Sequence, residues 1–397
     1  MTSEAFSPPR GGKIDEVDIR DRTINIESLQ TIEESTGQNP TSFCLWDDEF
    51  KNDTMHNKTM KYEKHLYDQG RLESCTCNAV ASAYRYLMQR RFSTERDPHG
   101  YYPSVYKPSR LFLYWVARIH MAKQIENPHR WGNYYAGLST SPPTDVGLLR
   151  DESEGTAIRT VIMIMARLGA PRESDDLINW ESGFYPYTYT RYLGSVDAEA
   201  YAKLKGPELE QVKSWSVPHD SKFILPEGAL AAMRPSDDVF KNCWRYEDLY
   251  YARPGRDYSH WKRCIANGLP IVFSAESYPG FDDEVHKDTS HLPKTPQPGS
   301  KPGKDDILNS HTMIAIGWND TMSDKNGGHG CFKVQNSWGI TDQPDPNYDG
   351  CCWIPYAWLN TVSPWRTEKG YFMINSPWAL TDQDGHTTIP NVEQPWR

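Results

Sequence analysis

One cysteine stands where a helix is expected to begin. Residues 68–79 read DQGRLESCTCNA, and in residues 75–91 the apolar positions recur on one helical face. Ser74, just before this run, is a candidate N-cap. Because the first backbone N–H groups of a helix are unpaired and the helix dipole is positive there, a thiolate at Cys75 would be stabilised. Cys75 is therefore a candidate nucleophile.

A thiolate nucleophile also needs a base that later protonates the leaving group. His311, which opens a β-rich run at 311–318, is a candidate for that base. Asn336 lies in the next β-rich run and could accept a hydrogen bond from the far side of the imidazole, which would fix the ring. Gln69, six residues before Cys75, could donate its side-chain amide to a developing oxyanion, with the Cys75 N–H as the second donor.

Each of these residues, taken alone, also has a structural explanation. A cysteine at the start of a helix is more often a small buried residue than a nucleophile. A lone His311 would be a strand residue beside a polar neighbour, and residues 336–339 alone could be a strand end and a turn. Cys77 points elsewhere on the same helix and is expected in the core. The occurrence of all the segments in one order is what favours catalysis.

The elements that must position these residues divide the sequence into a helical half and a β-rich half. Apolar periodicity predicts helices at 75–91, 109–125, 155–169, 197–214 and 259–267. Gly169 and Gly268 are expected to end two of them. Strands are predicted at 269–276, 311–318, 331–338 and 371–375. Helices followed by strands indicate the α+β class.

We expect this pattern to form three regions. Residues 1–60 are an N-terminal arm, residues 61–215 a mainly helical domain that carries the nucleophile, and residues 216–397 a mainly β domain that carries the histidine and the asparagine. Residues 279–309 are rich in Pro, Gly, Lys and Asp and are too long for an ordinary connection. They are predicted to be an insertion that is either a functional flap or mobile.

The chemistry-bearing segments together resemble those of the papain-like cysteine peptidases. The residues that carry the resemblance are DQGRLESC around Cys75, SHTMIAIGW around His311, VQNSWG around Asn336 and GCCWIPYAWL at 350–359. The helix start is similar to that of the subgroup with a Ser-Cys-Thr-x-Asn-Ala sequence. The resemblance covers roughly residues 62–375.

The resemblance implies a role for each candidate residue. Cys75 would be the nucleophile, His311 the general base and then acid, Asn336 the residue that orients the imidazole, and Gln69 an oxyanion donor. Trp338 would cover the contact between the asparagine and the histidine. The implied reaction is peptide hydrolysis through a thioester, with no metal or cofactor. The implied fold has a helical left domain and an antiparallel, β-barrel-like right domain, with the cleft between them.

The composition excludes several other classes of protein. The chain has 397 residues, a formal net charge of −10 and 12% aromatic residues, which rules out disorder throughout and argues against a nucleic-acid binder. No stretch approaches the ~20 apolar residues of a membrane helix, and residues 1–13 lack the apolar core of a secretory signal. We therefore expect a cytoplasmic protein without membrane contact, whose eight cysteines are thiols.

The expected partner is a peptide or protein substrate, and three questions stay open. Glu73, the segment 341–350 and the insertions depart from the family pattern and are compatible with a papain-fold binding or scaffold protein without turnover. Acyl transfer without proteolysis on the same thiol is a further alternative.

The N-terminal arm lacks the long helical pattern of the family's inhibitory propeptide. Either the enzyme is made without such a segment, which we prefer, or this arm blocks the cleft itself. The oligomeric state is left open.

Overall fold

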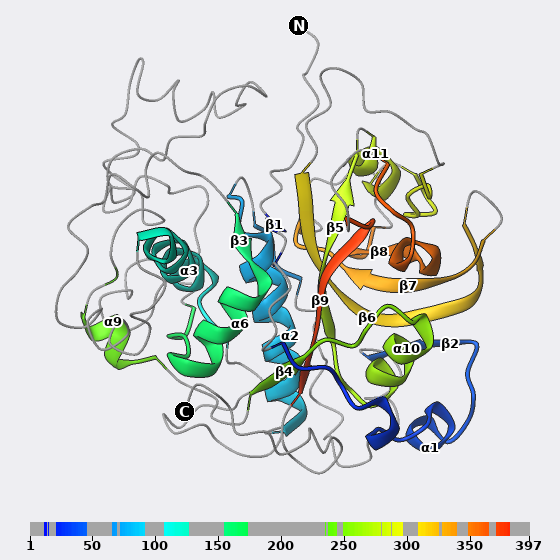
Figure 1. Ribbon diagram of the computed structural model, residues 1–397, viewed down its shortest axis with the longest axis horizontal. Helices are drawn as coiled ribbons and strands as arrows, with labels where there is room; N and C mark the ends of the chain where they lie inside the picture. Colours follow the sequence, from blue (N-terminus) through cyan, green and yellow to red (C-terminus); the bar gives the residue numbers. More distant parts are fainter. Residues whose placement is uncertain are drawn as a thin grey trace, which may run out of the picture.

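The long helices of the first half lie beside a mainly antiparallel sheet, most of whose residues come from the second half, in the computed structural model (Figure 1). The helix that begins at Cys75 runs between the other helices and the sheet, so the candidate nucleophile lies where the two halves meet. The structure describes residues 12–13, 15, 21–45, 66–69, 72–91, 107–126, 155–173, 235, 237–243, 249–278, 280–286, 288–296, 309–324, 328–339, 348–364 and 371–381.

Three long helices lie in the first half. They are α2 (Cys75–Arg91), α3 (Arg110–Glu126) and α6 (Ile158–Arg167). All three confirm the helices predicted at 75–91, 109–125 and 155–169, with ends that differ by at most three residues. After α6 the chain turns away at Gly169, whose φ is +77°, as the sequence predicted.

The remaining helices are shorter. They are η1 (Ile26–Ser28), α1 (Ile32–Thr36), α9 (Asp237–Lys241), α10 (Tyr258–Ala266), α11 (Phe281–His286) and η5 (Tyr356–Leu359). α10 confirms the helix predicted at 259–267, and Asp257 caps it by accepting a hydrogen bond from the Ser259 N–H at 2.8 Å. The helix predicted at 197–214 lies outside the described residues.

Nine strands among the described residues form one sheet. They are β1 (Gly12–Lys13), β2 (Ser42–Cys44), β3 (Thr156–Ala157), β4 (Tyr250–Ala252), β5 (Ile271–Ser277), β6 (Asn309–Ser323), β7 (His329–Gln335), β8 (Cys351–Pro355) and β9 (Ile374–Thr381). The main path runs β3–β1–β6–β5–β9–β4, with β2 and β7 also on β6 and β8 on β7. Every pairing is antiparallel except β1 with β3. The sheet is not closed and is barrel-like, so the predicted α+β class is confirmed.

One predicted strand is displaced along the chain. The runs predicted at 269–276, 311–318 and 331–338 are β5, β6 and β7, but the strand predicted at 371–375 begins only at Ile374 and continues to Thr381. Pro377 argues against a strand at these residues, because proline cannot donate to a β ladder. β9 accommodates the proline in a bulge: its register shifts between its pairings with Val272 and Ser274, and Ser376 has a φ of +49°.

The core extends through both halves around α2. Trp115 is buried on α3, and Trp261, Trp318, Trp358 and Trp378 are buried in the β-rich half. These five tryptophans are therefore part of the core.

Two segments expected at the periphery contribute to this core. Within the predicted N-terminal arm, β2 pairs with β6, and Leu29 and Leu45 are buried. Within the predicted insertion, Phe281 is fully buried at the start of α11. These parts of the arm and the insertion therefore belong to the packed fold. The domain boundaries near residues 60 and 215 stay predictions.

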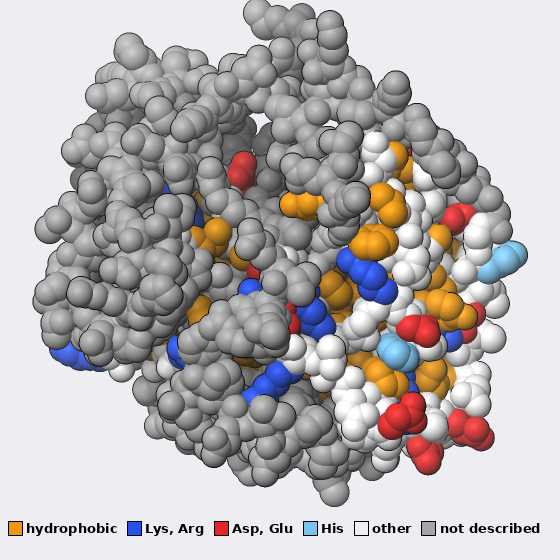
Figure 2. Space-filling model, viewed as in Figure 1, with side chains coloured by type: hydrophobic (Ala, Val, Ile, Leu, Met, Phe, Trp, Pro, Cys, Tyr) orange, Lys and Arg blue, Asp and Glu red, His pale blue; other side chains and the backbone are white. Residues whose placement is uncertain are grey.

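The described part of the surface carries charges of both signs. Figure 2 shows lysine, arginine, aspartate and glutamate side chains on the same face, interspersed with apolar ones. The described part of this face is therefore not uniformly basic, as a surface that binds nucleic-acid phosphates would be. None of the helices in the described part of the chain is both long enough and apolar enough to span a bilayer.

Candidate active site

Cys75 is the first residue of α2, as the sequence predicted. The Ser74 carbonyl accepts a hydrogen bond from the Asn78 N–H at 3.0 Å, which starts the helical ladder and puts Ser74 at the N-cap position. The Asn78 side-chain nitrogen also donates to the Ser74 hydroxyl at 3.1 Å. Cys75 is fully buried in this structure. A substrate could therefore reach the thiol only if a neighbouring segment moved.

His311 lies on β6, the strand that packs against α2, and Asn336 directly follows β7. The two side chains are in direct contact. Nε2 of the imidazole lies 2.7 Å from Oδ1 of the asparagine, and both residues are buried. The same Oδ1 accepts the Ser337 backbone N–H at 2.7 Å. Because a backbone N–H can only donate, this atom must be the amide oxygen, and Nε2 of His311 must carry the proton it donates. Nδ1 is then the ring nitrogen that can exchange a proton with a reacting group.

Trp338 covers this contact. Its ring stacks on the His311 ring with centroids 4.4 Å apart and planes 26° apart, and the indole is itself buried. Phe281 of α11 meets Trp338 edge-on, with ring centroids 6.2 Å apart. The exclusion of water by these rings strengthens the hydrogen bond between His311 and Asn336. The described part of the predicted insertion thus packs against Trp338 and supports the candidate site.

A chain of hydroxyl groups joins the residues that follow Cys75 and His311. The Thr76 hydroxyl donates to the Thr156 carbonyl at 2.8 Å and lies 3.0 Å from the Thr312 hydroxyl. Since the single Thr76 hydrogen is already used, Thr312 must donate to Thr76. Ser274 lies 3.1 Å from the Thr312 hydroxyl and completes the chain. Thr76 directly follows Cys75, and Thr312 directly follows His311. Their hydrogen bond therefore holds the two backbones together beside the candidate catalytic residues. The sequence analysis assigned no role to either threonine.

Gln69 lies in the same cluster, beside the residues that flank Asn336. Its backbone N–H donates to the Ser337 carbonyl at 2.8 Å, and its side-chain oxygen accepts the Ser337 hydroxyl at 2.6 Å. Its side-chain nitrogen donates to the Leu72 carbonyl at 2.9 Å. These contacts fix the amide near the start of α2. The role of Gln69 as an oxyanion donor stays a prediction.

Cys77 has the surroundings of a core residue. It is fully buried, and burial raises the pKa of its thiol far above the usual range. Its sulfur lies 3.7 Å from the Thr156 hydroxyl. A thiol held neutral is a poor nucleophile, which argues against Cys77 as the nucleophile. Among the described residues, no three His, Cys, Asp or Glu side chains are grouped as metal ligands would be.

Gly350 gives a test of how Asn336 is held. Its carbonyl accepts the Asn336 N–H at 2.9 Å, its φ is +81°, and a Cβ would stand 2.3 Å from Leu66 Cδ1. We expect Gly350→Ala to lower the free energy of unfolding by about 2–4 kcal/mol, through backbone strain plus the clash. Denaturant unfolding measures this loss.

The matched control for this substitution is Gly37→Ala. Gly37 has a similar φ of +73° but no atom within 4 Å of an added Cβ. It should therefore show only the backbone penalty, about 1–2 kcal/mol. Equal losses in the two variants would mean that the contact with Leu66 does not constrain Gly350.

Comparisons with known proteins identify the fold. No protein-family model and no curated protein matches the sequence. Among solved structures, the chain is similar to xylellain, a cysteine protease from Xylella fastidiosa, with 21% identity, a TM-score of 0.54, and coverage of 96% of this chain and 99% of that one. It is also similar, with 12% identity and a TM-score of 0.45, to procathepsin B from Trypanosoma congolense, over 94% of this chain and 87% of that one.

The fold is that of the papain-like cysteine proteases. This assignment rests on the match to xylellain, which spans nearly the whole of both chains. It confirms the fold that the sequence motifs implied.

Proposed function

We propose that the protein is a cysteine peptidase that hydrolyses peptide bonds through a covalent thioester. The observation that carries the proposal is the buried pair of His311 and Asn336 under Trp338, tied to the start of the Cys75 helix through Thr76 and Thr312. A binding or scaffold protein has no need for an oriented, water-shielded imidazole on a strand that is bonded to the start of a helix carrying a thiol. These contacts therefore favour turnover over the scaffold alternative.

In this proposal each residue moves a defined proton or charge. Nδ1 of His311 takes the thiol proton of Cys75, whose sulfur attacks the scissile carbonyl. The side-chain amide of Gln69 and the backbone N–H of Cys75 stabilise the oxyanion that forms. His311 then protonates the leaving amine, and a water molecule activated by the same imidazole hydrolyses the thioester. Asn336 keeps Nε2 protonated and the ring in place throughout.

An N-terminal strand supports an extended peptide as the substrate. β1 pairs through Gly12 with Ser310, the residue before His311, and on its other side pairs with Thr156 and Ala157 of β3. An extended segment is thus held between the two halves beside the candidate base. Main-chain pairing of this kind is how sheet edges bind peptides. It favours the second alternative for the arm, in which the arm blocks the site.

Removal of this strand should raise activity. A variant without residues 1–13 keeps Asp15, which accepts hydrogen bonds from Trp378 at 2.7 Å and from the Arg159 N–H. Loss of one or two strand hydrogen bonds, about 1 kcal/mol each, should increase the peptidase rate at low substrate concentration by about 5- to 30-fold. The measurement is the kcat/KM for a peptide substrate.

The control for this truncation lacks only residues 1–11 and retains Gly12 and Lys13. It should behave as the full chain does, because β1 can still pair. An equal rise in both variants would show that the strand itself does not restrict access.

A peptide library decides between the proposed function and its alternatives. The full chain is incubated with the library, and products are read by mass spectrometry, with and without prior alkylation by iodoacetamide. Cleavage that alkylation abolishes, with the label on Cys75, supports a cysteine peptidase. No cleavage, with Cys75 labelled no faster than the other cysteines, supports the scaffold. Incorporation of an added amine in preference to water identifies an acyl transferase.

We propose a reducing compartment as the location and a peptide or protein as the partner. All eight cysteines are described and remain thiols, which supports a reducing compartment such as the cytoplasm. The substrate is a peptide or protein. Trapping of bound proteins by the Cys75→Ala variant in a cytoplasmic extract, followed by their identification, tests both points.

A further inference from the structure

Arg110 is a buried cation at a position that disfavours positive charge. It is the first residue of α3, where the helix dipole repels cations, and its side chain is only 8% exposed. Glu173 compensates, because its carboxylate accepts hydrogen bonds from Nε at 2.9 Å and from Nη2 at 2.7 Å. The guanidinium also lies over the Tyr67 ring, 4.2 Å from the centroid. Held in this way, Arg110 presents Nη1 in one fixed direction.

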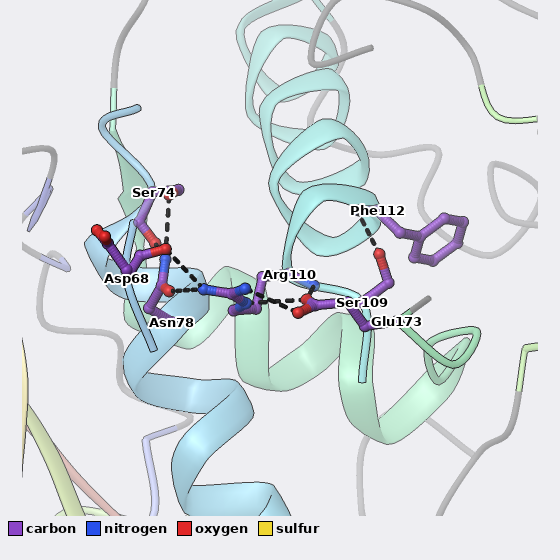
Figure 3. Close-up of polar contacts among 7 residues, drawn as sticks. All are labelled: Asp68, Ser74, Asn78, Ser109, Arg110, Phe112 and Glu173. Atoms are coloured by element: carbon purple, nitrogen blue, oxygen red, sulfur yellow. Dashed lines mark hydrogen bonds and ion pairs between the residues drawn. The ribbon is translucent and has the colours of Figure 1, made fainter. Parts of the chain in front are cut away.

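Nη1 of Arg110 binds two acceptors from different segments (Figure 3). One hydrogen goes to the Asp68 carbonyl at 2.9 Å and the other to Oδ1 of Asn78 at 2.7 Å. The planar guanidinium can make all these bonds at once because its donors point in fixed directions. One side chain therefore joins α3, the start of α2 and the segment that carries Gln69.

The contact with Asp68 fixes the backbone of Gln69. The Asp68 carbonyl and the Gln69 N–H belong to the same peptide group. Arg110 holds the oxygen of this group from the helical half, and the Ser337 carbonyl accepts its N–H at 2.8 Å from the β-rich half. A peptide group held at both ends cannot tilt. The side chain of Gln69 therefore starts from a fixed backbone.

The contact with Asn78 fixes the backbone N–H of Cys75. While Oδ1 of Asn78 accepts from Arg110, its Nδ2 donates to the Ser74 carbonyl at 2.9 Å and to the Ser74 hydroxyl at 3.1 Å. The Ser74 carbonyl and the Cys75 N–H share a peptide group. Arg110 thus reaches the second oxyanion donor through Asn78.

We propose that Arg110 is the positioning residue for both oxyanion donors. It acts on Gln69 through the Asp68 carbonyl and on Cys75 through Asn78. The inference rests on the proposed peptidase function. It explains why a cation is buried at the start of α3 at all. Oxyanion stabilisation depends on donors placed within a few tenths of an ångström, and a misplacement of about 1 Å lowers the rate by on the order of 100-fold.

Arg110→Lys tests the proposal, because lysine keeps the charge but cannot bind Asp68, Asn78 and Glu173 at the same time. All rates are expressed per active site, titrated with a peptidyl epoxide. We expect kcat to fall by about 10- to 100-fold with KM within about twofold. The affinity for a peptide aldehyde, whose adduct places an oxygen in the oxyanion position, should fall by a similar factor. Alkylation of Cys75 by iodoacetamide needs no oxyanion donor and should keep its rate.

Two further variants control for structural damage. Arg118→Lys makes the same change at another buried arginine of α3 and should retain kcat per active site. Asn78→Asp keeps the acceptor for Arg110 but loses the donors to Ser74, so it breaks the link to the Cys75 N–H and should lower kcat by about tenfold. If Arg110→Lys does not fold, Asn78→Asp decides the question by the same measurements.

The outcomes separate this inference from the function on which it rests. Unchanged kcat and aldehyde affinity in folded Arg110→Lys, or alkylation that slows in parallel with kcat, would overturn the positioning role and leave the peptidase assignment intact. A wild-type protein without Cys75-dependent turnover would overturn both.

Discussion

Replacement of Cys75 by alanine is expected to abolish peptide hydrolysis. Loss of the nucleophile removes the thioester route altogether, and single removals of a catalytic nucleophile lower kcat by on the order of 10⁵-fold or more. The variant should fold, because the cysteine side chain is small and alanine fits the same helix start. The measurement is the kcat for a peptide that the wild-type protein cleaves, together with the unfolding midpoint of both proteins.

The matched control is Cys77→Ala, the same change two residues along the same helix. Burial keeps the Cys77 thiol neutral by raising its pKa, so it takes no part in the proposed chemistry. Its removal should cost about 1–2 kcal/mol of stability through a small cavity and leave kcat per active site within about twofold. Retention of activity in Cys75→Ala, or loss of activity in folded Cys77→Ala, would contradict the assignment of Cys75 as the nucleophile.

The elements around the site were predictable because their signals are local. The helix at Cys75 follows from the apolar positions of residues 75–91, and β6 and β7 follow from short β-branched and aromatic runs. The order of Gln69, Cys75, His311 and Asn336 pointed to one chemistry before any distance was known. The contact of His311 with Asn336 then needed only the pairing of β6 with β7, which a short polar connection favours.

The residues that the sequence analysis missed act over long distances in the chain. Arg110 lies 32 positions from Asn78 and 63 from Glu173, and Thr76 lies 236 positions from Thr312. No periodicity or motif links such pairs, because the contacts exist only once the helices and the sheet pack. The available signal was chemical: an arginine at a predicted helix start, where a cation is electrostatically disfavoured, marks a buried partner. The strand at β9 was displaced for a different reason, since a bulge let Pro377 into the sheet.

Replacement of His311 by glutamine should produce the second large loss. Without the imidazole no group can take the thiol proton or protonate the leaving amine, and general acid–base catalysis of this kind contributes about 10²- to 10⁴-fold. Alkylation of Cys75 by iodoacetamide should also change. Its rate should no longer persist below neutral pH, and its midpoint should move toward that of an ordinary thiol, about 8.5. The measurements are kcat and the alkylation rate from pH 5 to 9.

His120→Gln is the matched control, because it makes the same change at another buried histidine. His120 lies on α3, and burial lowers its pKa to about 3, so it is neutral throughout this pH range. It should leave the alkylation profile and kcat per active site unchanged. A profile that is the same in wild type and His311→Gln would show that the thiol is not ionised by this imidazole.

Asn336→Ala completes the argument, because its proposed effect passes entirely through His311. Alone it should lower kcat by about 10- to 100-fold, less than His311→Gln, since Trp338 still stacks on the ring and partly holds it. Added to His311→Gln it should lower kcat no further, because residues that act as a unit are not additive. A full additional loss in the double variant would mean that Asn336 acts on the substrate or on Cys75 directly, and the orienting role would have to be given up.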